Sequence, residues 1–332
     1  METSPVRTGT GMILGKFLPP HLGHVYCAEF ARRFVERLTI LVCTLDREPI
    51  PGRLRFEWTR ELFPDCDVRH VTDDVPQAPA DHPDFWSIWR DLIRREMAAG
   101  PDFVFASEPY GFPLAEVLGA TFIPVDVGRE LVPVSGTAIR TDPLQHWRFL
   151  PACVRPYFVK RVCVFGPEST GKTTLARDLA LHFGTVWVSE FARGLLDHKA
   201  GRCDPADIPV IARGQVAAED AIARQADRVL FCDTDPLTTT IWSDVLFGDC
   251  PAWVRAEADR RTYDLYLLTD VDVPWVDDAQ RYLPDRRREF FDRCEAELRK
   301  RGRRYVTVRG TWDERRTTAV AAVESLLAAR LT

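Results

Sequence analysis

The segment Gly166-Pro-Glu-Ser-Thr-Gly-Lys-Thr173 has the residue types and spacing of a phosphate-binding loop. An apolar run precedes it at 159–165, and a helical pattern follows at 172–183. In such a loop, backbone N–H groups and the helix N-terminus bind phosphates, the lysine contacts the outer phosphates, and the threonine hydroxyl is a Mg²⁺ ligand. The sequence therefore predicts a nucleoside triphosphate site with Mg²⁺. The residues assigned to it are Gly166, Glu168, Ser169, Thr170, Gly171, Lys172, Thr173 and Thr174.

Three carboxylates follow predicted strands of the same half of the chain. Asp233 ends the apolar run 228–232, with Asp235 two residues later, and Glu190 follows an earlier strand. Asp233 is the better candidate for a second Mg²⁺ ligand beside Thr173. We expect one of these carboxylates to orient or deprotonate an attacking hydroxyl, and spacing does not choose among them. A solvated loop carboxylate and a structural salt bridge are the alternatives.

A basic segment begins at residues 274–281 and leads into three consecutive arginines at 286–288. Arginine suits bidentate phosphate contacts, so the segment resembles a lid over the nucleotide, with Arg281 on the phosphates. A solvated helix face is the alternative. The sequence has no NKxD-like segment. This absence argues against a GTPase and favours ATP.

The N-terminal half has a second set of candidate phosphate ligands. His21 and His24 stand three residues apart where a helix is expected to begin, so both rings lie on one face. Helix caps or a metal-binding pair would have the same spacing. Val134-Ser-Gly-Thr-Ala-Ile-Arg140 adds hydroxyls and an arginine at another helix start. The sequence thus predicts a second anion site.

Two tryptophans, Trp86 and Trp89, lie three apart on a predicted helix, 84–97. An exposed tryptophan can stack on a flat, positively charged ring, whereas packing of an amphipathic helix into the core is the alternative. Other candidate contacts to substrate or ATP are Ser107, Glu108, Asp126 and Arg129.

Apolar runs alternate with helical patterns along the whole chain, which predicts parallel sheets with crossover helices. Two prolines between 150 and 156 mark a break in this alternation. We therefore expect an α/β protein with two doubly wound domains, residues 1–152 and 153–332. The expected strands are 11–14, 38–43, 103–106, 121–126, 159–165, 185–188, 228–232, 264–268 and 305–308.

Composition narrows the functional class. The 332 residues carry a formal net charge of -5, so a general basic field for nucleic acid is absent. The nine cysteines include no CxxC pair and suggest a reducing compartment. No apolar run reaches the roughly 18 residues of a membrane span, and no secretory signal is visible, so a cytoplasmic protein without membrane insertion is expected. A homo-oligomer is possible, but the sequence does not decide it.

The N-terminal motifs resemble those of the nucleotidylyltransferase superfamily, HxGH and (I/V)S(G/S)TxIR. Lys16, His21, His24 and Arg140 match that pattern. The resemblance implies a Rossmann-like domain in which a substrate phosphate attacks the α-phosphorus of ATP and no enzyme nucleophile is needed. The ATP contacts that it implies are Gly15, Phe17, Gly23, Ser135 and Thr137.

Both halves in this order resemble the bifunctional NadR-type family. The segments that carry the resemblance are GKFLPPHLGH, SEPYG, VSGTAIR, GPESTGKTT, SEFAR, FCDTDPLTT and DVPWVDDAQR. The family implies phosphorylation of ribosylnicotinamide by a P-loop kinase domain, then adenylylation of the mononucleotide (NMN) to NAD. Substrate contacts are then expected at Trp86, Trp89, Arg193, Asp235, Trp275 and Asp278.

The chain has only about ten residues before its first expected strand. We therefore expect no helix-turn-helix domain and no DNA binding, unlike in some family members. The resemblance thus implies a two-step enzyme of NAD salvage. Two alternatives remain: an adenylyltransferase–kinase fusion for another nucleoside or vitamin precursor, and a nucleotide-sensing regulatory protein.

Overall fold

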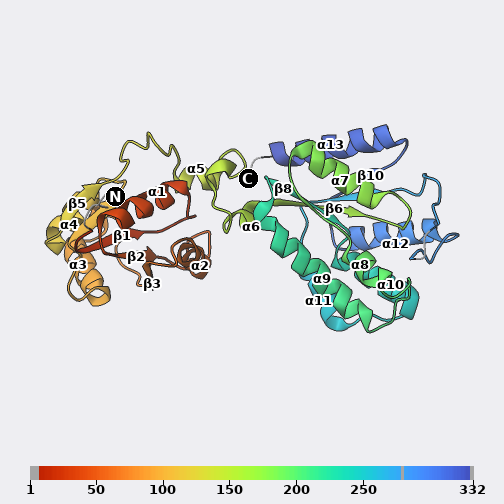
Figure 1. The fold of residues 1–332 in the computed structure, drawn as a ribbon, viewed down its shortest axis with the longest axis horizontal. Coiled ribbons are helices and arrows are strands. Elements are labelled where there is room, and N and C mark those ends of the chain that lie inside the picture. The colour runs from red at the N-terminus through yellow and green to blue at the C-terminus, as the bar shows by residue number, and fades with distance from the viewer. Residues whose placement is uncertain (1–6, 278–279, 330–332) are drawn as a thin grey trace, which may run out of the picture. The chain divides into compact units, whose positions relative to one another are not determined.

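The computed structural model describes residues 7–277 and 280–329. Its contacts divide the chain into two compact units, one up to Val154 and one from Arg155. Each unit is an α/β domain built around one five-stranded parallel sheet (Figure 1). Within the described part, no helix is long and apolar enough to cross a membrane.

The first sheet has the strand order β3-β2-β1-β4-β5. Every pair of neighbouring strands is parallel; Ile13 of β1, for example, is in register with Ile40 of β2 and Phe105 of β4. The strands are β1 (Thr10–Gly15), β2 (Arg37–Cys43), β3 (Asp67–Val71), β4 (Phe103–Ala106) and β5 (Thr121–Pro124).

Helices cover both faces of this sheet because neighbouring residues of a strand point to opposite sides. Ile13 and Ile40 pack with α1 and the end of α2, whereas Met12 and Leu41 pack with α3 and α4. The helices are α1 (Leu22–Phe34), α2 (Gly52–Leu62), α3 (Phe85–Glu96), α4 (Gly111–Leu118) and the short α5 (Gly136–Thr141), with 3₁₀ turns at Pro79–Asp81 and Trp147–Phe149.

The second sheet has the strand order β10-β9-β6-β8-β7 and is also parallel throughout. Its central strand, β6, carries Val162 and Val164 on one face and Cys163 and Phe165 on the other, and all four are fully buried. The strands are β6 (Lys160–Phe165), β7 (Trp187–Val188), β8 (Val229–Asp233), β9 (Leu265–Thr269) and β10 (Tyr305–Val308).

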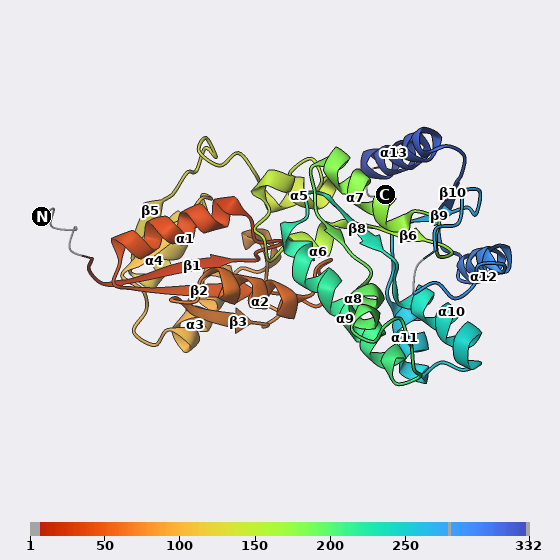
Figure 2. The same ribbon diagram turned by 45° about the vertical axis from the view of Figure 1, so that its right-hand side comes forward.

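Helices α7 and α13 cover the face of Val162 and Val164, and α9, α10 and α12 lie on the other side (Figures 1 and 2). The helices are α6 (Arg155–Phe158), α7 (Lys172–Phe183), α8 (Phe191–Asp197), α9 (Asp207–Ile222), α10 (Pro236–Phe247), α11 (Ala252–Arg260), α12 (Arg287–Lys300) and α13 (Trp312–Ala328), with a 3₁₀ turn at Ala223–Gln225.

Both sheets change winding direction at their first strand. Strand β1 lies between β2 and β4, and β6 lies between β8 and β9. In doubly wound sheets, ligands bind beyond the carboxyl ends of the strands at this switch point. The loop after β1 carries the two histidines and the loop after β6 is the glycine-rich loop, so each unit presents one predicted motif at this location.

Candidate functional site

A cavity of about 380 Å³ opens beside the glycine-rich loop of the second unit. It extends from the start of α7 to α8, α9, α10 and the segment 280–282. The sequence-predicted residues that line it are Glu168, Ser169, Thr170, Gly171, Lys172, Thr173, Thr174, Glu190, Arg193 and Arg281. Residues far apart in the chain therefore meet around one cavity, as the motifs predicted.

Two glycines allow the loop to take its shape. Gly166 has φ 132°, and a Cβ there would lie 2.7 Å from the Thr269 hydroxyl. Gly171 has φ 82°, and a Cβ there would lie 2.3 Å from the Trp312 ring. Other residues rarely adopt these angles, and neither position has room for a side chain. The buried Arg315 also stabilises the loop, because it donates a hydrogen bond of 3.1 Å to the Thr170 carbonyl.

The Thr173 hydroxyl donates a 2.5 Å hydrogen bond to Oδ2 of Asp233, at the end of β8. The other carboxylate oxygen, Oδ1, is buried without a hydrogen-bond partner among the described residues. A carboxylate and a hydroxyl oxygen are ligands that Mg²⁺ prefers, and Mg²⁺ is usually held by one or two carboxylates together with substrate phosphates. The pair therefore fits the predicted metal site, even though the described residues contain no cluster of three or more acidic, histidine or cysteine ligands.

Asp233 is fully buried. Burial, and after it the nearby Glu190 carboxylate, raise its pKa to about 7 against the lowering effect of Lys172. A cation bound at this carboxylate would reverse the shift, because it favours the ionised form. A proton and a metal ion would therefore compete for Asp233 near neutral pH.

Gln215 of α9 joins the strand ends that carry the two acids. Its amide oxygen accepts a 3.0 Å hydrogen bond from the Phe191 N–H, the residue after Glu190. Its amide nitrogen lies 3.4 Å from the carbonyls of Asp233 and Thr234. Gln215 is buried and lines the cavity, although the sequence analysis did not identify it. A glutamine inside an amphipathic helix gives no sequence signal for such a bridge.

Asp235 has a different role from the one expected. Its side chain is the N-cap of α10, accepting hydrogen bonds from the Thr238 N–H and hydroxyl at 2.8 and 3.0 Å and from the Tyr266 hydroxyl at 2.9 Å. The residue is buried and is not among those that line the cavity. Because both oxygens already have protein partners and the residue does not line the cavity, the structure argues against the expected substrate contact of Asp235.

The basic segment contributes one arginine to the cavity. Arg281 lines it, and its Nε and Nη1 atoms are buried without hydrogen-bond partners in the described part of the chain. Its guanidinium lies 5.7 Å from the ring centroid of Trp275, so these two predicted residues are neighbours. By contrast, the arginines at 286–288 pair with protein groups and do not line the cavity. Asp278 lies outside the described residues.

One part of the cavity lining is apolar and aromatic. Trp242 of α10 lines it and packs edge-on against Tyr282, with ring centroids 6.0 Å apart. Neither residue was predicted from the sequence: an aromatic residue in a helix, such as Trp242, is usually part of the core, and Tyr282 lies in a loop outside any motif. The remaining apolar lining comes from Leu196, Ile208, Ile211 and Leu246.

In the first unit, His21 and His24 form the N-terminus of α1. Nδ1 of His21 accepts the Gly23 N–H at 3.1 Å, Nδ1 of His24 accepts the His21 N–H at 3.2 Å, and the ring centroids lie 3.8 Å apart. Helix capping was one of the alternatives that the sequence left open for these histidines, and both side chains take part in the N-terminal cap of α1. Since Nδ1 accepts in both rings, a neutral imidazole carries its proton on Nε2. Both Nε2–H groups therefore remain available as donors.

Both histidines are held neutral. Burial, and after it the Arg129 cation, lower the pKa of His21 to about 4. Burial, His21 and Arg129 together lower the pKa of His24 well below its usual value. Neutral imidazoles at a helix N-terminus beside an arginine can donate hydrogen bonds to an anion without carrying charge themselves.

The second predicted motif of this unit, residues 134–140, contacts the loop between β1 and α1 that leads to His21. Ser135 caps α5 by accepting the Ala138 N–H at 3.1 Å. Arg140 donates a 2.5 Å hydrogen bond to the Leu18 carbonyl and a 3.1 Å hydrogen bond to the Thr137 hydroxyl. A Cβ at Gly136 would lie 2.6 Å from the same Leu18 carbonyl. The predicted anion-binding segments are therefore in contact, beside the switch point.

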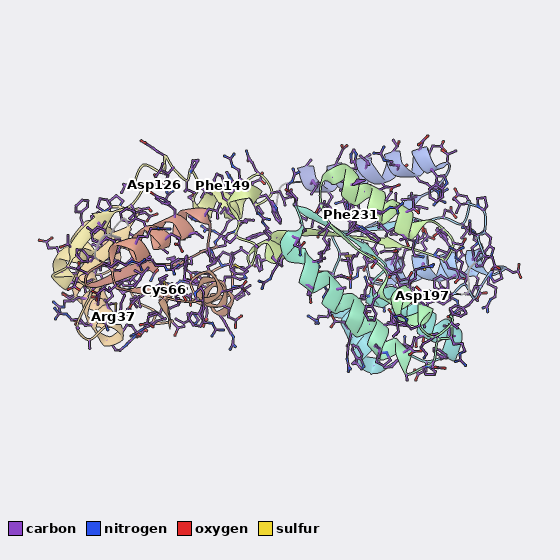
Figure 3. All side chains as sticks on the ribbon, viewed as in Figure 1. Arg37, Cys66, Asp126, Phe149, Asp197 and Phe231 are labelled. Atoms are coloured by element: carbon purple, nitrogen blue, oxygen red, sulfur yellow. The ribbon has the colours of Figure 1, made fainter. Side chains whose placement is uncertain are left out.

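Two acidic residues near this site bind protein groups. Asp126, labelled in Figure 3, accepts the N–H groups of Glu130, Leu131 and Val132 at 2.9–3.1 Å. Glu108 pairs with Arg129 at 2.9 Å. Asp126 thus orders the loop that carries Arg129, and its hydrogen bonds argue against direct substrate contact.

Trp89 is a core residue, contrary to the expectation that it stacks on a ligand. It is 8% exposed, packs with Phe85 and Leu92, and donates a 2.9 Å hydrogen bond to the Pro76 carbonyl. Trp86 is half-buried, with its ring edge-on to Phe85. The two tryptophans, three residues apart, therefore have different exposures.

Comparison with known proteins gives consistent relatives. The "AAA domain" family model matches residues 161–315. The trifunctional NAD biosynthesis/regulator protein NadR of Escherichia coli K12 is 31% identical over 297 residues, which cover 82% of this chain and 72% of that protein. Its counterpart in Salmonella typhimurium LT2 has the same identity and coverage.

Two crystal structures of NadR share the fold. One, in complex with NR, superposes with a TM-score of 0.79 at 22% identity, covering 99% of both chains. The other, in complex with NAD and AMP-PNP, has the same TM-score and identity and covers 98% of both chains. The α/β architecture predicted from the sequence is thereby confirmed for both units.

Proposed function

The chain belongs to the NadR family, and we propose that it is a bifunctional NAD salvage enzyme. Its second unit phosphorylates ribosylnicotinamide with ATP, and its first unit adenylylates the resulting NMN to NAD. One observation carries this proposal: each unit has its own phosphate-binding motif at the switch point of its own sheet. Two successive phosphoryl-group reactions need two such sites.

The kinase step uses the cavity beside the glycine-rich loop. The loop N–H groups and Lys172 bind the phosphates of ATP, and Arg281 adds charge at the same cavity. Thr173 and Asp233 would hold Mg²⁺, which would supply positive charge beside the phosphates. The 5′-hydroxyl oxygen forms a bond to the γ-phosphorus while the bond from that phosphorus to ADP breaks.

Glu190 is the residue that we assign to the attacking hydroxyl. It begins α8, lines the cavity, and lies close enough to Asp233 to raise the pKa of that acid. Asp233 already accepts from Thr173 and fits the metal, so Glu190 is left to orient the hydroxyl and accept its proton. Arg193, three residues later on α8, lines the same cavity, and we assign it to substrate contact.

The aromatic end of the cavity supports ribosylnicotinamide as the phosphate acceptor. Trp242 and Tyr282 offer aromatic rings to a flat cationic pyridinium, a combination that cation–π attraction favours. The ribose then lies between these rings and the loop. We assign the nicotinamide ring to this end, with the 5′-hydroxyl directed towards Glu190.

The adenylylation step needs no enzyme nucleophile. An NMN phosphate oxygen forms a bond to the α-phosphorus of ATP, and the bond to the pyrophosphate leaving group breaks. His21 and His24 donate from Nε2, while Lys16 and Arg140 supply positive charge. Catalysis here is positioning plus stabilisation of charge in the transition state.

The test supplies each intermediate separately. The protein is incubated with Mg²⁺, ATP and either ribosylnicotinamide or NMN, and the products are separated chromatographically. We expect NMN and NAD from the first mixture, and NAD plus pyrophosphate from the second. Absence of both products from both mixtures, or faster turnover of another nucleoside in a substrate panel, contradicts the proposal. Tight nucleotide binding without turnover would favour the alternative function of a nucleotide-sensing regulatory protein.

A further inference from the structure

Glu48 is a nearly buried acid beside the histidine loop of the first unit. It lies in the connection between β2 and α2, and its side chain is 8% exposed. Its carboxylate forms an ion pair with Nζ of Lys16 at 3.0 Å, and it accepts hydrogen bonds from a guanidinium nitrogen of Arg55 at 2.6 Å and from the Leu45 N–H at 2.9 Å. No motif in the sequence identified it.

Arg55 binds the backbone of the same lysine. Its side chain is fully buried, and it donates a 2.7 Å hydrogen bond to the Lys16 carbonyl besides its bond to Glu48. Lys16 is therefore held at its backbone by Arg55 and at its ammonium by Glu48. Its side chain is still 49% exposed, and an ammonium has three donors, so one bond to Glu48 leaves two for a phosphate.

The Lys16 turn adjoins the histidines. The next residue, Phe17, has φ 46° and is 2% exposed, and its ring centroid lies 4.7 Å from that of His24. A shift of Lys16 would therefore be transmitted to the histidine pair. Burial raises the pKa of Glu48, but Leu45, Lys16 and Arg55 outweigh burial and lower it, so the carboxylate is ionised at neutral pH.

We propose that Glu48 is a positioning residue for adenylyl transfer, holding the Lys16 ammonium where the phosphates of ATP are bound. Arg55 keeps Glu48 in place and fixes the Lys16 backbone. This inference rests on the proposed function of the first unit. A small displacement of a charged group can cost up to about a hundredfold in rate, because the charge must meet the transition state with little reorganisation.

The decisive variant is Glu48→Gln in the full chain, with NAD formation from NMN and MgATP as the readout. We expect kcat to fall by roughly 10- to 100-fold, with a smaller change in KM, because an interaction used mainly in the transition state is lost. Phosphorylation of ribosylnicotinamide should be unchanged. The control is Glu57→Gln on α2, which breaks an exposed ion pair with Arg53 and should change neither activity.

A double variant separates positioning from simple stabilisation of the fold. If Glu48 acts through Lys16, adding Glu48→Gln to Lys16→Met should cause no further loss of kcat. An equal additional loss in that background overturns the inference, and so does a Glu48→Gln protein with wild-type kcat. If wild-type protein makes no NAD from NMN, the proposed function itself fails.

Glu48→Asp provides a second variant if Glu48→Gln does not fold. It keeps a negative charge for Arg55 but withdraws the carboxylate from Lys16 by one methylene. The same loss of kcat, again absent in the Lys16→Met background, is expected. Wild-type kcat in a folded Glu48→Asp protein would show that the distance to Lys16 is unimportant and would overturn the inference.

Discussion

Thr173 and Asp233 share a 2.5 Å hydrogen bond that joins the glycine-rich loop to the end of strand β8. The two residues are sixty positions apart in the chain, and the pairing of β6 with β8 brings them together. The bond leaves the second Asp233 oxygen buried without a partner in the part of the chain that the structure describes. The fold thus maintains a buried acid ready for a cation at some cost in stability, as is common at functional sites.

The first prediction concerns Asp233→Asn and stability. Because burial raises the pKa of Asp233 to about 7, the folded protein binds this proton more tightly than the unfolded chain does. Protonation of Asp233 therefore stabilises the folded protein fully below about pH 4, the usual range of carboxyl pKa values. This stabilisation is lost as the pH rises through about 7. We expect the variant to be more stable than wild type at pH 8 by at least about 1 kcal/mol, and to gain little at pH 4.

Urea unfolding without Mg²⁺ checks this prediction at both pH values. The control is Asp227→Asn, which alters a half-exposed acid paired with Arg228 just before the same strand and should show no pH-dependent gain. Kinase activity should fall by at least about a hundredfold in Asp233→Asn, because a metal ligand is lost. If the variant and the wild type are equally stable at pH 8, the buried Asp233 carboxylate does not destabilise the wild-type protein, and the prediction is contradicted.

The second prediction separates the two activities. Lys172→Ala removes the ammonium at the triphosphate site of the second unit, so phosphorylation should fall by at least about a hundredfold while NAD formation from NMN persists. His24→Ala should have the reverse effect, because it removes a donor from the first unit only. Each activity is measured with its own substrate, and circular dichroism confirms folding. Loss of both activities in either folded variant would contradict independent sites.

The motifs that form each site were predictable because each is local. A glycine-rich loop, or two histidines at a helix start, brings its own backbone geometry, so the segments 166–173 and 21–24 could be recognised without knowledge of the fold. The strand β3 was missed for a related reason. It lies at the sheet edge, and its sequence Asp-Val-Arg-His-Val has only two apolar residues, with neither a continuous apolar run nor a regular alternation to detect.

The two errors overlooked local signals, whereas the omission of Glu48 involves a contact between distant segments. Trp89 belongs to the apolar face of α3 with Phe85 and Leu92, and helical spacing with attention to phase indicates this. The Asp235-Pro236 pair is a sequence signal for a helix N-cap, and it outweighs the reading of Asp235 as a ligand. The contact of Glu48 with Lys16 carries no local signal, because it depends on how two loops meet.

The third prediction follows from the neutral histidines. Since burial lowers the pKa of His21 to about 4 and that of His24 well below its usual value, neither ring changes charge near neutral pH. The kcat/KM for NAD formation should therefore show no histidine titration between about pH 6 and 8. Depressed pKa values also mean that stability is lost as pH falls from about 6.5 towards 4.

A pH series of initial rates with saturating Mg²⁺ checks the activity, and thermal unfolding at the same pH values checks the stability. His24→Gln, which keeps a hydrogen-bonding side chain without a titrating ring, should lose less stability than wild type on acidification. An inflection of kcat/KM near pH 6.5 that disappears in this variant would show that a charged imidazole takes part.

The last prediction concerns Trp312, the first residue of α13, which no motif indicated. Its side chain is 53% exposed, and its ring lies so close to the glycine-rich loop that a Cβ at Gly171 would approach it to 2.3 Å. A flat exposed ring beside a phosphate-binding loop is suited to stack on the base of the bound nucleotide. Stacking of a base on an aromatic ring contributes about 1–3 kcal/mol, so Trp312→Ala should raise the kinase KM for ATP roughly tenfold.

Two matched variants make this prediction specific. Trp312→Phe keeps an aromatic face and should retain most of the ATP affinity. Trp253→Ala removes another exposed tryptophan of the second unit, which packs against Arg213 on α9, and should leave the KM unchanged. Inhibition by inorganic tripolyphosphate, which has no base, should be the same in Trp312→Ala and wild type. If Trp312→Ala weakens tripolyphosphate and ATP equally, the ring supports the shape of the loop and does not bind the base.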